Sequence, residues 1–359
     1  MSDTASRRSP ILEPARLESL VEGAVGFLRG PDSIQPIRLP ERDLDLMHPS
    51  LRSPFTAEAA AGIRLRLRTE ARVIRLQVSH AIPDQYPGEP TYDLLVEGSP
   101  VPFRRRSDGT LPLTFDGLPS GDKTVEIWFP PGLGVRLHGL TVEPDVGVAP
   151  APHDGPRWVV YGSSITHCAW VPLTDTWPSI AARALGWNLT CLGFNGGCHL
   201  DPFTARAMAA LPADRFTLKL GINVHNLQTL RERTFAPLVH GFIATLRDSH
   251  PTTPITVVSP IISPSRETSV ISDIPVLSGT GAALVGDLTL SDIRAALQQI
   301  VEVLRQRGDD SIDYLDGRHL FGASDVDHLP DGLHPDADGY TLIARRFIAR
   351  HDTHELEET

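Results

Sequence analysis

Hydrophobic and polar residues alternate with a period of two in several short runs within the first 145 residues. In the clearest run, residues 63–68 read Ile-Arg-Leu-Arg-Leu-Arg, the pattern of a strand with one buried and one solvated face. Turns rich in Gly, Pro and Asp separate this run from the others. The spacing predicts an antiparallel β-sandwich, with further strands at residues 72–78, 92–96, 124–129 and 135–142.

The pattern changes after residue 156, where short apolar runs alternate with segments of helical periodicity. This order predicts a doubly wound parallel sheet in a three-layer arrangement, with helices covering both faces. Five strands are predicted, at residues 158–161, 187–192, 216–220, 255–259 and 312–315. The helices are predicted at residues 176–185, 202–211, 235–246 and 292–307, the last with Ser291 as its cap and Gly308 as its stop.

A linker separates the two patterns. The segment from Pro144 to Pro156 is rich in Pro, Gly and Ala and has no periodicity. A length of 359 residues also fits two domains, at roughly 150 residues each. We therefore predict a sandwich domain at residues 1–148, a linker at 149–156 and an α/β domain at 157–359.

Composition and charge narrow the classes of partner. The formal charge of -11 argues against a nucleic acid, because binding to the phosphate backbone requires a basic surface. No stretch approaches the roughly 18 apolar residues of a membrane span, so no membrane partner is expected. The N-terminus lacks the apolar run of a secretion signal, which predicts a cytoplasmic protein, and the three cysteines are expected to be free thiols.

Polar residues follow the first three predicted strands of the α/β domain, where ligands of doubly wound sheets bind. Residues 161–166 read Tyr-Gly-Ser-Ser-Ile-Thr, and this turn could present Ser163 or Ser164 as a nucleophile. The next loop contains Gly196, whose N–H could bind an anion, and the third strand is followed by the amide of Asn223. Each has a structural alternative, because Ser and Asn cap helices and Gly forms turns.

An Asp and a His lie three residues apart near the C-terminus. The loop containing Gly332 would let the Asp331 carboxylate reach Nδ1 of His334, leaving Nε2 free as a base. Alone, this pattern is equally consistent with a surface ion pair. Four such signals, each following a strand or preceding a helix, together indicate a functional site much more strongly than any one of them.

At these residues the sequence resembles the SGNH (GDSL-type) serine hydrolases. Ser164 takes the position of the family's nucleophile, although Ser163 replaces the usual Asp before it and Val224 replaces the usual Asp after the Asn. These departures affect neighbours of the catalytic positions and concern local support and substrate preference. Four of the family's blocks match in order, at residues 162–166, around Gly196, at 221–223 and at 331–334.

The resemblance implies a flavodoxin-like arrangement of the five-stranded sheet, preceded by a jelly-roll-like β-sandwich. Residues 91–98 are similar to a strand of the sandwich domains that precede some family members. The resemblance to the SGNH hydrolases also implies that Ser164 attacks an ester, that His334 transfers the proton and that Asp331 orients the imidazole. The implied oxyanion hole consists of the N–H groups of Ser164 and Gly196 and the side-chain amide of Asn223.

Three further residues, Ser163, His199 and His225, are expected to line the substrate pocket. The pairs His167-Cys168 and Cys198-His199 follow the first two blocks and could meet in space. A zinc site or a Cys168–Cys198 disulfide is then an alternative to ordinary pocket lining. The spacing matches no compact zinc motif, so pocket lining is favoured and neither a metal nor a cofactor is expected.

The connection at residues 261–290 is unusually long and is predicted to be a lid or gating loop, with a mobile spacer as the alternative. The leading functional prediction is an esterase that cleaves a small-molecule acyl ester, such as an O-acetylated carbohydrate or a secondary metabolite. An acyltransferase that uses the same acyl-enzyme is the first alternative. A non-catalytic carbohydrate-binding protein is the second, and assembly into a homo-oligomer is left open.

Overall fold

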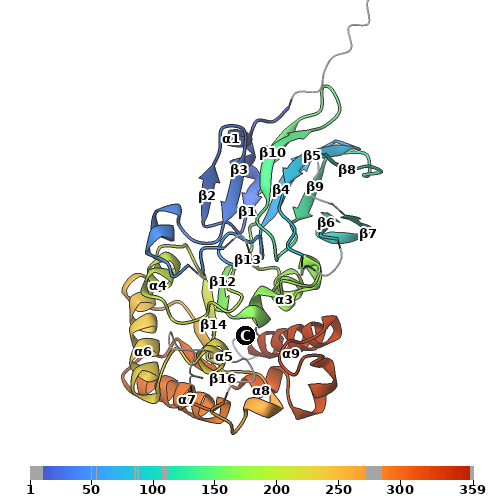
Figure 1. The fold of residues 1–359 in the computed structure, drawn as a ribbon. Helices are drawn as coiled ribbons and strands as arrows, with labels where there is room; N and C mark the ends of the chain where they lie inside the picture. Colours follow the sequence, from blue (N-terminus) through green and yellow to red (C-terminus); the bar gives the residue numbers. More distant parts are fainter. Residues whose placement is uncertain are drawn as a thin grey trace, which may run out of the picture.

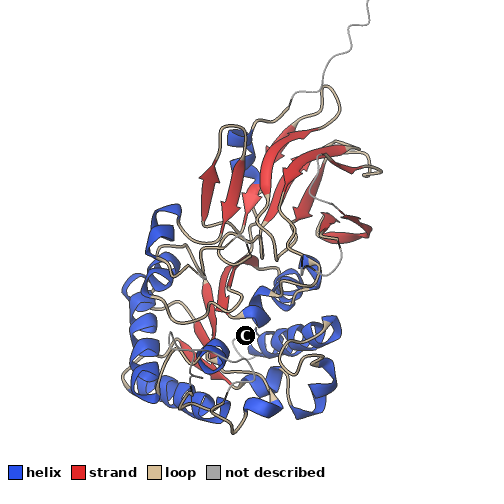
Figure 2. Ribbon diagram, in the orientation of Figure 1, coloured by secondary structure: helices blue, strands red, loops and turns tan. Residues whose placement is uncertain are grey.

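The computed structural model describes residues 11–49, 51–53, 55–84, 86, 89–106, 112–271 and 285–355. Two antiparallel sheets form an N-terminal β-sandwich, and a parallel sheet flanked by helices follows it (Figures 1 and 2). The predicted fold class is therefore confirmed. No helix within these ranges is long and apolar enough to cross a bilayer.

The sandwich buries one face of each sheet against the other. In the central strand β4 (Arg64–Thr69), Leu65 and Leu67 are fully buried in the sandwich core, as their alternation predicts. One sheet has the order β2 (Gly26–Arg29), β3 (Ile34–Ile37), β10 (Arg136–Thr141), β5 (Ile74–Ser79), β8 (Leu113–Phe115). The other has the order β1 (Val21–Glu22), β4, β9 (Lys123–Trp128), β6 (Thr91–Val96), β7 (Ser99–Arg106), and β11 (Val148–Pro150) also pairs with β4.

The outward face of β4 is solvated at one end, where Arg68 is exposed as predicted, and buried at the other. Arg64 is only 1% exposed, because it contacts the α/β domain. Its guanidinium lies 5.0 Å from the ring of Trp128 and donates to Leu189 O at 3.2 Å and Asn188 Oδ1 at 2.8 Å. The arginine thus links the two domains.

The chain leaves the sandwich later than the predicted linker suggests. Strand β11 pairs with β4 through Pro150, so residues 149 and 150 still belong to the sandwich sheet. The α/β domain then begins with β12 at Arg157.

The parallel sheet has the strand order β13 (Asn188–Gly193), β12 (Arg157–Gly162), β14 (Arg215–Lys219), β15 (Ile255–Val258), β16 (Ile312–Leu315). If the five strands are numbered as they follow in the chain, their order in the sheet is 2-1-3-4-5, the flavodoxin-like order. The chain places successive strands in opposite directions across the sheet on either side of the point between β12 and β14. Side chains of β12 alternate between two cores. Trp158 and Val160 face one side, and Val159 and Tyr161 face the other.

Helices cover both faces of this sheet (Figure 1). Those on the side of Tyr161 are α4 (Pro202–Ala209), α6 (Glu232–Ser249) and α7 (Leu290–Gln306). Those on the side of Trp158 are α3 (Trp177–Leu185) and α9 (Ala337–Glu355). Three shorter helices of this domain are also described, α2 (Ser164–His167), α5 (Ile222–Leu227) and α8 (Gly317–Leu320), whereas the short helix α1 (Pro14–Leu17) packs in the sandwich.

Helix α7 begins earlier than predicted. Thr289, rather than Ser291, is its N-cap, because Asp292 stands three residues after Thr289 and completes a capping box. The Thr289 hydroxyl accepts from Asp292 N–H at 3.1 Å, and the Asp292 carboxylate accepts from Thr289 N–H at 2.9 Å.

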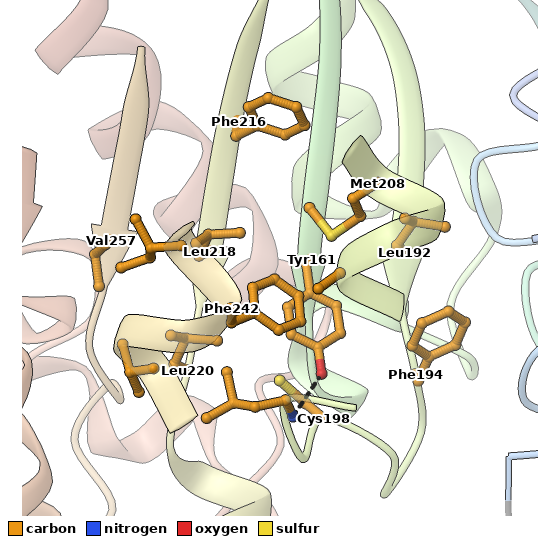
Figure 3. Close-up of a cluster of buried hydrophobic side chains, with 14 of the residues drawn as sticks. Tyr161, Leu192, Phe194, Cys198, Met208, Phe216, Leu218, Leu220, Phe242 and Val257 are labelled. Atoms are coloured by element: carbon orange, nitrogen blue, oxygen red, sulfur yellow. Dashed lines mark hydrogen bonds between the residues drawn. The ribbon is translucent and has the colours of Figure 1, made fainter. Parts of the chain in front are cut away.

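The core on the side of Tyr161 extends to the edge of the sheet where the polar loops gather (Figure 3). The Tyr161 ring stacks on Phe242, with centroids 5.1 Å apart. Its hydroxyl accepts a hydrogen bond from Leu200 N–H at 3.1 Å. Tyr161 therefore fixes the end of the loop that follows β13.

Candidate active site

The candidate site lies at the carboxyl ends of β12 and β14, on either side of the point where the strand order reverses. This is the edge at which doubly wound sheets bind their ligands. Residues 163–167 follow β12, and Ile222 begins α5 directly after β14 and a two-residue turn. The loop after β13 completes this edge.

Ser164 is held at a tight turn between β12 and α2. A Cβ on Gly162 would lie 2.3 Å from Thr166 Oγ1, so only glycine fits where the strand turns into the helix. Ser163 is the N-cap of α2, fully buried, and its hydroxyl accepts from Ile165 N–H. Ser164 is the first residue of α2 and is half-buried. Its Oγ lies 2.8 Å from Nε2 of His334.

His334 is oriented by Asp331. Its Nδ1 lies 2.6 Å from Asp331 Oδ2, and its main-chain N–H donates to Oδ1 at 2.7 Å. The carboxylate can only accept, which places the proton on Nδ1 and leaves Nε2 to accept from the Ser164 hydroxyl. Gly332 has φ +73°, a conformation that lets the short loop double back.

The environment keeps Asp331 ionised. Partial burial favours the neutral acid, but hydrogen bonds from the N–H and imidazole of His334 and from Leu333 N–H outweigh it. The net result is a pKa of Asp331 below its usual value. The carboxylate is therefore negative when the imidazole takes up a proton.

The Asn223 side chain contacts the loop after β13 directly. Asn223 Oδ1 accepts from Cys198 N–H at 3.0 Å, which directs the amide donors of Nδ2 to the opposite side. Gly196 has φ +66°, and a Cβ there would meet no atom within 4 Å. Its carbonyl accepts from His199 Nε2 at 2.9 Å. The contact with Cys198 thus fixes the orientation of the Asn223 amide.

The three residues predicted to line the pocket have other contacts. Ser163 is a buried helix cap, as described above. His225 is 2% exposed and its Nδ1 bonds to Leu288 O at 2.9 Å, so it anchors the chain entering α7. His199 is half-buried and bridges the carbonyl of Gly196 and the hydroxyl of Thr229. Of the three, His199 alone retains a partly exposed side chain beside the site.

The His-Cys pairs after the first two blocks also have separate partners. His167 Nε2 donates to Pro131 O at 2.7 Å, and Nδ1 accepts from Asn195 N–H at 3.2 Å. The Cys168 and Cys198 thiols are free and buried, and burial raises the pKa of Cys198 to about 12. Within the described residues no three His, Cys, Asp or Glu side chains form a metal-binding group.

The long connection after β15 is described at its two ends. At its start, Ser263 bonds to the His334 loop and Arg266 to α5, and at its end Leu288 bonds to α5. Residues 272–284, including the glycine-containing run 279–283, lie outside the described residues. Arg266 in the first part is a site neighbour that the sequence pattern did not identify. It donates to Asn226 Oδ1 at 3.0 Å and to Gly332 O at 3.3 Å.

Comparisons with known proteins agree with this architecture. The salicylyl-acyltransferase SsfX3 from a tetracycline biosynthetic pathway has a TM-score of 0.84 at 29% identity, covering 98% of each chain. A protein from Bacteroides ovatus described as a GDSL-like lipase has a TM-score of 0.71 at 19% identity, covering 95% of this chain and 96% of its own.

A family two carbohydrate esterase from Clostridium thermocellum, in complex with cellohexaose, has a TM-score of 0.61 at 16% identity, covering 95% and 98%. No curated protein sequence matches this chain. The sequence pattern of one family does match, over residues 156–348, more than half of the chain. The protein therefore belongs to the GDSL-like lipase/acylhydrolase family.

Proposed function

We propose that this protein is a serine esterase that hydrolyses a small acyl ester through an acyl-enzyme on Ser164. The observation that carries the proposal is one continuous chain of hydrogen bonds. It runs from Ser164 Oγ to His334 Nε2 at 2.8 Å, and from His334 Nδ1 to Asp331 Oδ2 at 2.6 Å. A nucleophile, a base and a group that orients the base form this arrangement in acyl-transfer enzymes.

In the first half-reaction, Ser164 Oγ bonds to the ester carbonyl carbon while its proton moves to His334 Nε2. The tetrahedral intermediate collapses, the C–O bond to the alcohol breaks, and His334 returns the proton to the departing oxygen. In the second half-reaction, water attacks the acyl-enzyme and gives a proton to His334, which returns it to Ser164 as the carboxylic acid leaves. Asp331 stabilises the imidazolium in both steps.

The oxyanion is expected to form between α2, the loop after β13 and α5. The N–H of Ser164 belongs to the first turn of a helix, where N–H groups lack intrahelical acceptors. The N–H of Gly196 and Nδ2 of Asn223 are the two further donors in the proposal. Donors fixed before the reaction are worth about 10²–10³ each in rate, because they need no reorganisation as charge develops.

We propose an O-acylated carbohydrate or secondary metabolite as the substrate class. The family two carbohydrate esterases share the two-domain fold of this chain. The half-buried nucleophile leaves access for a soluble ester, and the net charge of -11 disfavours strongly anionic substrates.

A fluorophosphonate probe tests the proposal directly, because it reacts only with an activated serine. We expect the probe to label Ser164 and p-nitrophenyl esters of short acyl chains to be hydrolysed. Ser164→Ala should abolish both signals. Lack of labelling in the folded wild-type protein, together with no turnover across the ester series, would remove the serine mechanism.

His328 supplies a matched control for His334. Its Nδ1 lies 3.1 Å from Asp336 Oδ1, so it forms a second Asp–His pair only six positions away in the chain. His334→Ala should prevent labelling, whereas His328→Ala should be labelled at the wild-type rate. Equal loss in both variants would indicate a general disturbance of the segment rather than loss of a base.

The alternative is an acyltransferase that passes the acyl group to an alcohol or amine. It is favoured by one observation, the likeness to the acyltransferase SsfX3 over 98% of both chains. The two reactions share the acyl-enzyme and differ in what attacks it. Product analysis with and without hydroxylated acceptors separates them, since a transferase yields a new ester at the expense of free acid.

A further inference from the structure

We infer that Arg266 is a positioning residue that holds the Asp331–His334 loop and the Asn223 helix in register. This inference rests on the proposed function of that site. Arg266 lies in the connection after β15, within the short 3-10 helix Pro264–Arg266, and is 3% exposed. Its guanidinium contacts both sides of the candidate site.

On one side, Arg266 fixes a single peptide unit of the His334 loop. The carbonyl of Gly332 accepts from Ser263 Oγ at 2.8 Å and from Arg266 NH1 at 3.3 Å. Arg266 NH1 also donates to Ser263 Oγ at 2.9 Å, so the two donors support each other. The loop carbonyl is thus held by two side chains from one segment.

The same peptide unit orients the Asp331 carboxylate. A planar peptide couples the Gly332 carbonyl to the Leu333 N–H. That N–H donates to Asp331 Oδ1 at 2.9 Å. Any rotation of the Gly332 carbonyl therefore moves a donor that holds Asp331, and with it the partner of the His334 imidazole.

On the other side, Arg266 contacts the helix that presents Asn223. Its Nε donates to Asn226 Oδ1 at 3.0 Å, and Asn226 lies three residues after Asn223 on α5. Residues three apart lie on the same side of a helix, one turn from each other. One planar guanidinium, whose donors have fixed directions, thus joins the base loop to the helix of the oxyanion donor.

The expected consequence is a loss of catalytic alignment. A misplacement of about 1 Å can cost about 10² in rate even when the altered residue does not touch the reacting atoms. Arg266→Met removes every donor while keeping a side chain of similar length. We expect kcat to fall about 10²-fold with KM changed little, because the substrate pocket itself is unaltered.

Arg247 is the matched control. It also uses its guanidinium to hold main-chain carbonyls, donating to Thr253 O at 2.6 Å and Ser311 O at 3.1 Å, and it pairs with Asp309 at 2.8 Å. These contacts lie next to the starts of β15 and β16, at the opposite edge of the sheet. Arg247→Met should lower the melting temperature and leave kcat at the wild-type value.

The experiment measures kcat, KM, the pH profile of kcat/KM and the melting temperature for wild type, Arg266→Met, Arg266→Lys, Ser263→Ala and Arg247→Met. Ser263→Ala keeps one donor to Gly332 and should lose less activity than Arg266→Met. Arg266→Lys, with one cationic donor, should recover part of kcat. If Arg266→Met does not fold, these two milder variants decide the question.

A kcat of Arg266→Met within twofold of wild type, with only the melting temperature lowered, would overturn the inference. Crystal structures of wild type and Arg266→Met give a second readout that does not depend on turnover. We expect the Ser164 Oγ to His334 Nε2 distance to lengthen in the variant, and an unchanged distance also contradicts the inference. Failure of the proposed function would appear separately, as an unlabelled and inactive wild-type protein.

Discussion

The side-chain carbonyl of Asn223 accepts a hydrogen bond from the main-chain N–H of Cys198 at 3.0 Å. Asn223 follows β14 and Cys198 belongs to the loop after β13, so this contact spans the point where the strand order reverses. It sets which end of the amide faces the loop and which end remains available as a donor. The oxyanion role proposed for Asn223 depends on this orientation.

Replacing Asn223 should therefore lower the rate of acyl transfer without unfolding the protein. Asn223→Ala removes the proposed donor, and we expect kcat to fall about 10²–10³-fold. Asn223→Asp keeps an acceptor for Cys198 N–H but places a negative charge beside the oxyanion, so it should be at least as slow. Steady-state kinetics with a p-nitrophenyl ester and a melting curve test this. An Asp variant as active as wild type would exclude Asn223 as an oxyanion donor.

Asp331→Asn should separate the orientation of His334 from the fold of its loop. The amide still offers an oxygen to His334 N–H and Leu333 N–H but cannot hold the Nδ1–H tautomer or stabilise the imidazolium. We expect kcat to fall by about 10⁴, as in comparable Ser-His-Asp sites. Fluorophosphonate labelling should slow in parallel. A fall of less than tenfold would show that the carboxylate is not needed to orient the base.

His167 makes the stability of the protein depend on pH. Burial, followed by the nearby Arg38 cation, lowers the pKa of His167 well below 6.5, despite its bond to Pro131 O. The folded protein therefore keeps the ring neutral, with Nδ1 accepting from Asn195 N–H. The unfolded chain takes up a proton as the pH falls below 6.5, so the unfolded state gains protons that the folded state does not.

Stability should consequently fall as the pH drops from 6.5 toward about 5, by up to about 1.4 kcal/mol per pH unit from this residue. His167→Gln cannot titrate and should show a shallower slope over the same window. Urea unfolding of both proteins at several pH values measures the two slopes. Parallel slopes would show that His167 is protonated equally in the folded and unfolded states.

The five strands of the parallel sheet could be predicted from the sequence because they are short apolar runs between amphipathic helices. The residues brought together at Ser164 could be predicted because each follows a strand or precedes a helix, which restricts where its side chain can lie. Their roles came from the resemblance to a known family rather than from spacing. The predicted strand pattern and fold class are confirmed by the sheet order.

The interface between the domains could not be predicted from periodicity. An alternating strand predicts one polar face but not what covers it, so the pattern predicts a solvated Arg64 although the α/β domain buries this side chain. Arg38 is another example. It is fully buried and donates to Ala59 O at 2.7 Å and to Gly193 O, just before the loop that contains Gly196. Nothing around Arg38 in the sequence distinguishes it from a surface arginine.

Lys219 is a further buried cation, at the end of β14. It is 2% exposed, and Nζ has no hydrogen-bond partner among the residues that the structure describes. Burial lowers the pKa of Lys219 from 10.5 to about 8, even though nearby Cys198 and Cys168 act in the opposite direction. Holding the charged form at neutral pH therefore costs on the order of 3 kcal/mol.

Lys219→Met should stabilise the protein at pH 7, because the thioether side chain fills similar space without a charge. Below pH 8 the lysine is charged in both states and the gain is full. Between pH 8 and 10.5 the folded protein releases the proton first, so the stability of wild type rises and the advantage of the variant shrinks. Urea unfolding at pH 7 and pH 10 measures both effects.

Lys123 is the matched control, because its ammonium donates to Gly121 O at 3.0 Å. Lys123→Met should destabilise the protein, since it removes satisfied hydrogen bonds. A Lys219→Met variant less stable than wild type at pH 7 would mean that the ammonium is paired in solution.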